Sequence, residues 1–386
     1  MKESKPKSTS QGPLAMWHCM DVPRVVKLLS MRPPIHWSRW HRWAMLPPCA
    51  VYNSVMGRVE DWLYGRRVAQ TEIHPSPIFI IGHWRSGTTL LHNLMSLDRQ
   101  FTYPNMYHAA FPHHFLLTER VMSRLTAPLL PKSRPMDNIE AGWGMPQEDE
   151  IALCALCMIS PYVMVAFPEK STYIDYFDFK TASDEVVQEW KATFLEFLRK
   201  VTYREPKPIV LKSPSHTYRI PLMLEMFPQA KFIYIHRHPY DVFRSSLHLR
   251  NTLFESNALG RLNKEPWAEE ILHDYRWAVE CYERDRHLIP AGSLHEVRFE
   301  DLESDPLSEM ERVYAGLGLP GFDAAKKALT PEVQRLEGYQ KNSFRRMPAE
   351  TKRLVYERIR TVFDRYGYDP EGADVEPGAQ QWAVPA

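Results

Sequence analysis

The 386-residue chain has few cysteines, and nothing in their spacing would crosslink a small domain. The five are Cys19, Cys49, Cys154, Cys157 and Cys281, an odd and widely scattered set that argues against a disulfide framework. Cys154 and Cys157 form a C-x-x-C pattern. They lie in an apolar stretch, however, and no second pair of cysteines or histidines completes a zinc site. We therefore expect core thiols in a protein of the reducing cytoplasm.

Strong net charge and a long unbroken apolar run are also missing. The net charge of +1 argues against a general nucleic-acid-binding surface, because such modules carry a large basic excess. The polar, basic N-terminus has no apolar stretch behind it, so no secretory signal is expected. The longest uncharged run, residues 151–168, is short for a membrane span and is interrupted by Pro161. It predicts a buried helix that breaks at Pro161.

The chain does have an aromatic and basic N-terminal region. We expect disorder over 1–13, a Trp-rich helical segment over 14–70, a main domain over 71–368 and a loose tail over 369–386. The prolines at 33–34 and 47–48 predict two or three short helices in the Trp-rich segment. Packing against the main domain is the favoured interpretation. A lip on a membrane surface stays open, because tryptophan and arginine suit that interface. The tryptophans are Trp17, Trp37, Trp40, Trp43 and Trp62.

Short apolar runs predict buried β-strands at 78–81, 209–211 and 231–235, with a further candidate at 295–299. Helical spacing follows three of these, at 89–95, 220–227 and 241–250. Longer helices are predicted at 101–132, 183–203, 265–288 and 307–317. Strands that alternate with helices in this way indicate an α/β fold, with a central, mostly parallel sheet flanked by helices.

A glycine-bearing loop joins the first strand to its helix. Backbone N–H groups and a helix N-terminus converge in such a loop, and this suits a phosphate. Gly87 lets an anion approach closely, and Arg85 adds a charged donor fork. Thr88 stands where nucleotide triphosphatases carry lysine, which disfavours an ATP- or GTP-dependent enzyme. The loop reads Gly82-His83-Trp84-Arg85-Ser86-Gly87-Thr88-Thr89, and its anion-binding candidates are Arg85, Ser86, Gly87, Thr88 and Thr89.

A second polar group follows the third strand. Arg237 leaves the carboxyl end of that strand, at the edge where open α/β sheets bind ligands. Ser245 comes eight residues later on the next helix. The two side chains can converge on a second anion. An Arg237–Asp241 surface pair beside an ordinary helix serine explains them equally well.

Together the two motifs resemble the sulfotransferases that use 3′-phosphoadenosine 5′-phosphosulfate (PAPS), and within them the bacterial and tyrosylprotein branch. The likeness covers residues 77–344. The loop of that branch typically reads P-R-S-G-T-T, so Trp84 replaces a proline. The family's 3′-phosphate motif, an arginine and a serine eight residues apart, matches Arg237 and Ser245. The resemblance implies a P-loop-type three-layer fold, a sulfotransferase domain over 71–368, and PAPS as co-substrate; the leaving group is already an anion, so no metal is required.

Three further stretches are similar to that branch. The resemblance implies that Lys212, at a strand end, reaches the bridging oxygen of the donor, while Arg85 and the loop amides hold its phosphate and sulfuryl oxygens. Residues 146–150 match an acidic helix start of bacterial relatives. Residues 338–342 resemble, more weakly, a late basic loop over the cofactor, which implies contacts from Lys341 and Asn342.

The acceptor hydroxyl has a high pKa, so a general base helps the reaction. The glutamate that serves the tyrosylprotein branch is not carried over, because this chain has Asn105 and Met106 in that neighbourhood. His216 is favoured slightly over Glu148, since it follows Lys212 by four residues and titrates near neutrality. An acidic residue at a helix start is equally explained by the helix dipole. The full set of candidates is His216, Glu148, Glu150 and His108.

The acceptor pocket is expected to come from residues 101–115, from 151–167 and from the region after Ser246. Their Met, Phe and Tyr content favours a partly apolar hydroxyl (or amine) acceptor, although core packing explains the same residues. We predict a small-molecule, lipid or glycan acceptor, no nucleic-acid partner, and a cytoplasmic protein whose peripheral membrane contact is left open. Two other functions also stay open: a P-loop kinase for a nucleotide or small molecule, and a non-catalytic nucleotide-binding or membrane-associated protein.

Overall fold

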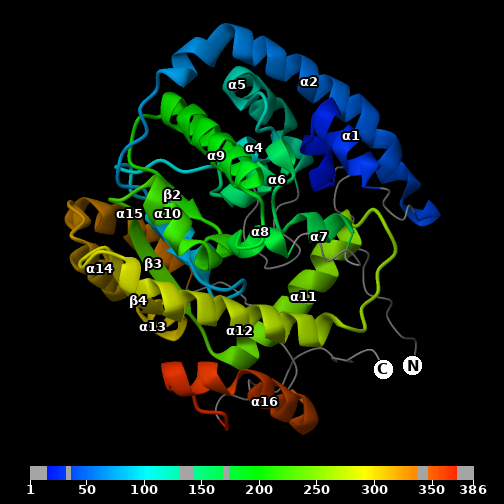
Figure 1. Cartoon of the computed structure of the whole chain (residues 1–386). Helices are drawn as coiled ribbons and strands as arrows, with labels where there is room; N and C mark the ends of the chain where they lie inside the picture. Colours follow the sequence, from blue (N-terminus) through cyan, green and yellow to red (C-terminus); the bar gives the residue numbers. More distant parts are fainter. Residues whose placement is uncertain (1–14, 32–35, 131–141, 168–173, 337–346, 372–386) are drawn as a thin grey trace.

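The computed structural model describes residues 15–31, 36–130, 142–167, 174–336 and 347–371, so the expected disorder of 1–13 and the contacts of Lys341 and Asn342 lie outside it. Its centre is a four-stranded sheet in the order β2-β1-β3-β4, in which every neighbouring pair is parallel (Figure 1). The strands are β1 (Ile78–Ile81), β2 (Val210–Lys212), β3 (Lys231–His236) and β4 (Leu294–Arg298). All four predicted strands, and the parallel sheet, are confirmed.

Both faces of the sheet are covered by helices. Phe79 and Ile81 point to one face, Ile78 and Ile80 point to the other, and all four are buried. The first face packs against α6 (Asp149–Cys157), α9 (Asp184–Arg204) and α10 (Ile220–Met226). The second packs against α3 (Thr88–Ser96), α14 (Pro306–Leu317) and α15 (Phe322–Leu336). Burial on both faces explains why β1 is a continuous apolar run rather than an alternating one.

A further apolar cluster lies beside the sheet rather than on it. It joins α7 (Val163–Ala166), α11 (Pro239–Asn257), α12 (Trp267–Asp285) and α16 (Ala349–Tyr366) to the N-terminal segment. The sequence patterns do not predict α15 (Phe322–Leu336) or α16 (Ala349–Tyr366). Both are amphipathic surface helices whose few buried residues are separated by charged ones, so no apolar run marks them.

The N-terminal segment forms α1 (Val22–Ser30) and α2 (Trp40–Ala69), each preceded by a short 3-10 helix, Met16–Cys19 and Trp37–Arg39. The predicted break at residues 47–48 is wrong, because α2 runs through both prolines for 30 residues. Pro47 and Pro48 are exposed, whereas Leu46 and Ala50 are buried. The proline rings therefore point to solvent, and the backbone carbonyls that lose a hydrogen-bond partner lie on the same exposed side. There the loss of helix stability is smallest. Figure 1 shows α2 arching over the outside of the molecule.

Two other helix predictions need correction. Residues 101–132 do not form one helix: Thr102 makes a parallel bridge to Ile209, and α4 (Met106–Ala110) and α5 (Phe115–Thr126) follow separately. Asn105 caps α4 by accepting a hydrogen bond from the backbone N–H of His108, 2.8 Å away. The buried helix predicted over 151–168 ends at Cys157, because Met158 takes a left-handed conformation before Pro161 is reached.

The chain after the last helix is held as far as the structure describes it. Tyr240 donates a hydrogen bond to the carbonyl of Pro370 (3.1 Å), and His236 Nδ1 lies 2.8 Å from the hydroxyl of Tyr368. The predicted loose tail therefore begins as fixed chain, and residues 372–386 lie outside the description. The remaining helices are α8 (Asp175–Asp178), α13 (Phe299–Ser304) and the 3-10 turns Ala127–Leu129, Pro214–Tyr218 and Arg286–Leu288. None of the helices in the described ranges has the length and apolar character needed to cross a bilayer.

Candidate active site

The loop between β1 and α3 has a backbone that its two glycines make possible. Gly82 has φ 142°, and a Cβ there would lie 2.3 Å from the carbonyl oxygen of Ile235. Gly87 has φ 100°, caps α3, and packs so closely on the ring of Phe299 that a Cβ would lie 2.2 Å from it. Thr217 fixes the loop start by accepting a hydrogen bond from Gly82 N (2.8 Å). Any side chain at either glycine would displace the loop.

The second anion motif lies directly against this loop. The side chain of Arg85 donates from Nε to the hydroxyl of Ser245, 2.6 Å away, so residues 160 positions apart in sequence are joined. The guanidinium of Arg237 stacks on the ring of Phe299 at 4.2 Å and lies 3.9 Å from the carboxylate of Asp241. Phe299 thus separates Gly87 from Arg237 and touches both. The structure brings the two groups of predicted anion ligands to one edge of the sheet.

Some donors at this edge are buried and have no hydrogen-bond partner within the described part of the chain. They include the hydroxyl of Ser86, the Nε of Arg237 and the hydroxyl of Ser213, which follows Lys212. An unsatisfied buried donor costs about 1–3 kcal/mol, so such groups are normally paired in a working site. Their positions beside a helix N-terminus and a glycine-supported loop fit a phosphorylated ligand with more than one anionic group.

Lys212, at the end of β2, is 1% exposed and forms a 2.6 Å ion pair with Glu148. The other carboxylate oxygen of Glu148 accepts a short hydrogen bond from the hydroxyl of Tyr162. The Tyr162 oxygen in turn accepts from the indole N–H of Trp84 (3.0 Å), a residue of the loop. Burial, together with the charge of Glu148, raises the pKa of Tyr162 well above its usual value, so Tyr162 stays a donor. This chain of contacts links the loop to Lys212 through Glu148.

Glu148 is one of three consecutive acidic residues, and each of them pairs with a different basic residue. The next two pairs are fully buried. His216 Nε2 lies 2.6 Å from Asp149, and Arg219 donates hydrogen bonds from both its terminal nitrogens to the carboxylate of Glu150, at 2.8 and 3.2 Å. Of the three carboxylates only Glu148 is partly exposed, at 15%. The start of α6 is therefore paired at three points with the end of β2 and the segment after it, and Glu148 is the acid that solvent or an acceptor can reach.

His216 lies inside the core rather than at the site surface. Its ring makes contacts with Phe79, Phe194 and Trp190, and it is 0% exposed. Burial opposes ionisation of Asp149, but the charge and hydrogen bond of His216 prevail and lower the pKa of that carboxyl. An acceptor molecule cannot touch His216 in this arrangement, because aromatic rings and Asp149 surround it.

Two more buried histidines flank the site. Burial, with a contribution from the charge of Lys212, lowers the pKa of His92 to about 3. Burial likewise lowers the pKa of His83 in the loop to about 4, and its Nδ1 lies 2.8 Å from the carbonyl oxygen of Trp84. Both imidazoles are therefore neutral at pH 7, so the positive charge near Glu148 comes from Lys212.

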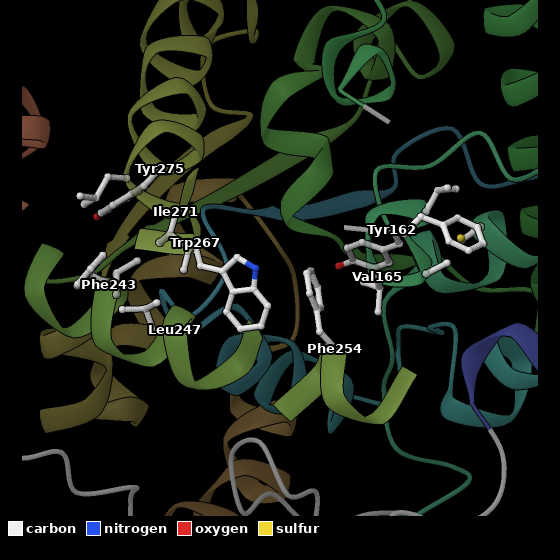
Figure 2. Close-up of a cluster of buried hydrophobic side chains, with 14 of the residues drawn as sticks. Tyr162, Val165, Phe243, Leu247, Phe254, Trp267, Ile271 and Tyr275 are labelled. Carbon is white, nitrogen blue, oxygen red and sulfur yellow. The ribbon is translucent and has the colours of Figure 1, made fainter. Parts of the chain in front are cut away.

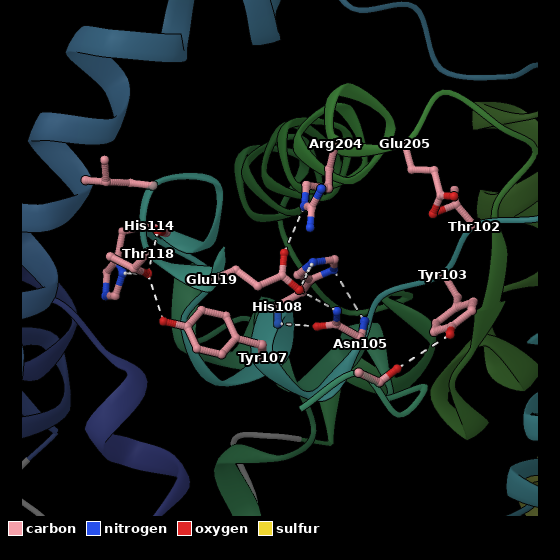
Figure 3. A network of polar contacts seen from close by, with 12 residues as sticks. Thr102, Tyr103, Asn105, Tyr107, His108, His114, Thr118, Glu119, Arg204 and Glu205 are labelled. Atoms are coloured by element: carbon pink, nitrogen blue, oxygen red, sulfur yellow. Dashed lines mark hydrogen bonds and ion pairs between the residues drawn. The ribbon is translucent and has the colours of Figure 1, made fainter. Parts of the chain in front are cut away.

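The other candidate base, His108, belongs to a separate polar network (Figure 3). Its Nε2 lies 3.3 Å from Glu119, which also accepts hydrogen bonds from Arg204 (2.9 Å) and Asn105 (2.8 Å). Burial lowers the pKa of His108. Burial would raise the pKa of Glu119, but its three partners lower it to about 2. The network connects α4, α5 and α9, and the contacts of His108 are structural.

Of the segments expected to form the acceptor pocket, two meet next to Tyr162. Val165 of α7 and Phe254 of α11 lie in the same apolar cluster as Tyr162, with Trp267 packed edge-on against Phe254 at 5.4 Å (Figure 2). Residues 101–115 approach Glu148 from another side, because the carbonyl of Pro104 accepts a hydrogen bond from the backbone N–H of Gln147 (2.8 Å), while Tyr107 and Phe115 pack in the cluster on the first face of the sheet. Tyr162 thus links Glu148 to an apolar cluster to which α7, α11 and α12 contribute.

Sequence reasoning missed Tyr162, Phe299 and the contact role of Trp84. Tyr162 sits in an apolar run that reads as core, and Phe299 was counted as a strand end. The one available signal was the hydroxyl of Tyr162 within the largely apolar residues 151–167, which needs a partner when buried.

Comparisons with known proteins agree on one family. The sequence model described as "Sulfotransferase family" matches residues 77–324. A curated relative, omega-hydroxy-beta-dihydromenaquinone-9 sulfotransferase Stf3 of Mycobacterium bovis, is 37% identical over 354 residues, 91% of each chain, and its Mycobacterium tuberculosis counterpart matches equally.

Solved structures share the fold. Sulfotransferase STF9 of Mycobacterium avium aligns with TM-score 0.65 and 17% identity, covering 92% of this chain and 98% of that one. STF1 of Mycobacterium tuberculosis aligns with TM-score 0.57 and 18% identity, covering 78% and 80%.

Proposed function

Because this chain belongs to the sulfotransferase family, and so catalyses sulfuryl transfer, we propose that its sulfate donor is PAPS, bound at the carboxyl edge of the sheet. One observation carries this proposal: the 2.6 Å hydrogen bond from Arg85 to Ser245, which joins the two anion motifs. A nucleotide phosphorylated on both the 5′ and the 3′ oxygen needs two adjacent anion sites. A nucleoside triphosphate instead needs a lysine at the position of Thr88.

The residues present fit such a donor. Arg85, Ser86 and the backbone N–H groups of Gly87, Thr88 and Thr89 are assigned to the 5′-phosphosulfate, and Arg237 and Ser245 to the 3′-phosphate. Support comes from the Ser86 hydroxyl and Arg237 Nε, which are buried and have no partner among the described residues, since both are donors that an anion would satisfy. The donor supplies the sulfuryl group together with a phosphate leaving group.

For the base we assign Glu148 rather than His216, which reverses the slight preference drawn from the sequence. Glu148 accepts the proton of the acceptor hydroxyl at its carboxylate as that oxygen bonds to sulfur. Lys212 donates a hydrogen bond to the oxygen that becomes negative when the old sulfur–oxygen bond breaks. Tyr162 holds the Glu148 carboxylate in place. The assignment is supported by the Lys212–Glu148 ion pair and by the partial exposure of Glu148, which buried His216 lacks.

For the acceptor we propose a hydroxyl on a small molecule or lipid with an apolar body. The apolar cluster of Tyr162, Val165, Phe254 and Trp267 lies beside Glu148 and would accommodate such a body. The curated mycobacterial relative is named for a menaquinone-derived lipid, which agrees with this class. A cytoplasmic location stays a prediction, based on five cysteines that are all free.

Calorimetric titration with 3′-phosphoadenosine 5′-phosphate tests the donor site. Binding in the presence of a chelator is expected, and also tests whether a metal is needed. Arg237→Ala should weaken binding about ten- to a hundredfold, because it removes charged hydrogen bonds worth about 1.5–3 kcal/mol. Arg298→Ala is the matched control, since Arg298 ends the neighbouring strand β4 and pairs with Glu300. A preference for ATP, or equal losses in both variants, would overturn the proposal.

Transfer of radiolabelled sulfate tests the acceptor class. The purified enzyme and labelled donor are offered a lipid extract and, separately, water-soluble phenols and glycans. We expect the label in the lipid extract or in apolar hydroxyl compounds. Label confined to polar glycans would contradict an apolar acceptor, while leaving the donor assignment to be judged by the calorimetry.

A further inference from the structure

The helix α2 carries apolar residues on both its sides. Its inner side packs on the protein through Leu46, Ala50 and Val68. Opposite to these, an outward stripe recurs every three or four residues, which is the spacing of one helix face. This outer face consists of Trp40, Ala44, Pro48, Val51, Val55, Val59 and Trp62, and every member is exposed.

The exposed apolar side chains of the described residues are concentrated here. Sixteen large hydrophobic residues are exposed, and all but Val121, Leu125, Ile174 and Leu288 lie between residues 22 and 63. Trp37, Trp40 and Trp62 are 80%, 66% and 83% exposed, and the other described tryptophans are at least half-buried. Clustering of this kind, in contrast to scattered apolar residues, marks an interaction surface.

The charge around this face is positive. Residues 15–31 and 36–70 contain seven Lys and Arg against three Asp and Glu, a net charge of +4, whereas the whole chain has +1. Two of the three acids are already engaged: Asp21 caps α1 and pairs with Arg24, and Glu60 is buried against Lys200. Among the bases, Arg39 pairs with Glu255 and Arg42 is buried. Asp61 is the one exposed acid of these ranges, and the exposed Arg58 and Arg66 lie along the outer face.

We propose that the outer face of α2 docks on an anionic lipid bilayer, with the helix lying in the plane of the interface. Trp40 and Trp62 stand 22 positions apart, near the two ends of the stripe, about 33 Å along the helix. Tryptophan at both ends, valine between and arginine alongside is the composition of an interfacial helix. The exposed Arg58 and Arg66 beside the stripe favour an anionic bilayer as the occupant, because such a surface attracts each arginine near it.

The docked face would be tied rigidly to the active site. Arg42 and Trp43 of α2 donate hydrogen bonds to the carbonyls of Ala258 (2.6 Å) and Leu259 (3.1 Å), just after the helix that carries Ser245. Leu46 and Tyr162 belong to the same apolar cluster. The docking proposal does not depend on the acceptor proposed above.

Vesicle flotation of the full chain, without donor or acceptor, tests the docking. Vesicles of phosphatidylcholine alone are compared with vesicles that also contain phosphatidylglycerol, and binding is expected mainly to the second kind. Trp40→Ser and Trp62→Ser should each weaken it about tenfold, the equivalent of half-burying one large apolar side chain. Leu288→Ser changes an exposed apolar residue that lies outside the outer face of α2. It is the matched control and should leave vesicle binding unchanged. Arg58→Gln should weaken binding about fivefold, to the anionic vesicles alone.

Several results would overturn the proposal. One is failure to float with either vesicle, and another is equal binding by the tryptophan variants and the control. A third is a stable dimer in sedimentation that Trp62→Ser dissociates, because a second copy would then cover the face. Sulfate transfer to a water-soluble acceptor is measured in parallel and should be unchanged in every variant. Loss of that activity in the unmodified chain would count against the proposed function and leave the docking result intact.

Discussion

Replacing Glu148 by glutamine separates proton transfer from every other role of this residue. The amide has nearly the shape of the carboxylate and can still accept a hydrogen bond from Lys212, but it cannot take up a proton. If Glu148 is the general base, kcat should fall about a hundred- to ten-thousandfold, the usual contribution of such a group. The affinity for 3′-phosphoadenosine 5′-phosphate should change little, because the assigned phosphate ligands are on other elements.

The assay is transfer of radiolabelled sulfate to one alcohol acceptor and to analogues fluorinated next to the hydroxyl. Fluorine lowers the hydroxyl pKa while changing the shape little, so it replaces part of the work of a base. The deficit of Glu148→Gln should therefore shrink steadily as the acceptor becomes more acidic. The deficit of Lys212→Ala should not, since Lys212 acts on the leaving oxygen.

Tyr162→Phe is the matched neighbour, because it removes one hydrogen bond to Glu148 and leaves the carboxylate. It should cost about tenfold in kcat, the value of one charge-assisted hydrogen bond. The reasoning would be refuted if Glu148→Gln lost less than about tenfold with the unmodified alcohol, well below the range for a general base. It would equally be refuted if the loss were the same for every acceptor, since Glu148 would then only position Lys212.

Three further predictions concern stability. Glu60→Gln should lower the free energy of unfolding by about 3 kcal/mol, because it leaves the buried charge of Lys200 unpaired; urea unfolding followed by circular dichroism measures this. As pH falls from about 6.5 towards 3, the unfolded chain gains a proton that buried His92 does not, so stability should drop by up to about 1.4 kcal/mol per pH unit. His92→Gln should reduce the slope of the urea midpoint against pH over that window, although other buried histidines such as His83, whose pKa is also lowered, keep part of it. An unchanged slope would contradict the lowered pKa of His92. His216→Asn should destabilise the fold by leaving Asp149 without its partner, yet reduce kcat of the folded fraction less than Glu148→Gln does; a larger kcat loss would restore His216 as the base.

The strands and the two anion motifs could be predicted because their signals are local. Three apolar runs, a glycine-bearing loop and an arginine at a strand end are each contained in a few consecutive residues. The parallel sheet then follows, because strands joined by helices place their carboxyl ends at one edge. Neither the strands with their motifs nor the parallel sheet required knowing which residues far apart in sequence are in contact.

The base that we propose, Glu148, could not be chosen from the sequence, because the choice depends on pairings between distant segments. Glu148, Asp149 and Glu150 are indistinguishable as a run of acids until each is paired with Lys212, His216 or Arg219. His216 titrates near neutrality in isolation, but burial among aromatic rings removes it from the acceptor. Proximity to Lys212 in sequence was therefore a poor guide to proximity in space.

The course of α2 was mispredicted for a different reason. Pro47 and Pro48 are strong helix breakers by propensity, but propensity yields when tertiary packing holds the helix on the opposite side. Leu46 and Ala50 anchor that side, and the pair of Glu60 with Lys200 fixes the helix further along. The orientation of the two prolines, which decides the cost, is not visible in the sequence.

The three ion pairs at the start of α6 divide the residues near the site into two groups. Residues 148–150 tolerate little change in sequence, whereas the residues that follow α6 tolerate more. A one-residue insertion between Glu148 and Glu150 would mismatch two fully buried pairs at once. Within the described residues, the stretch beyond Met158, which supplies Tyr162 and Val165, is held mainly by apolar contacts. Its polar attachments are the bonds of Tyr162 and a hydrogen bond from Leu259 N to the carbonyl of Ala166 (3.2 Å). Exchanging Val165 and Phe254 for other apolar residues should then redirect the enzyme to acceptors of a different shape while the transfer chemistry stays in place. Under selection for a new acceptor, we expect useful substitutions in the stretch beyond Met158 and at Phe254 rather than at residues 148–150.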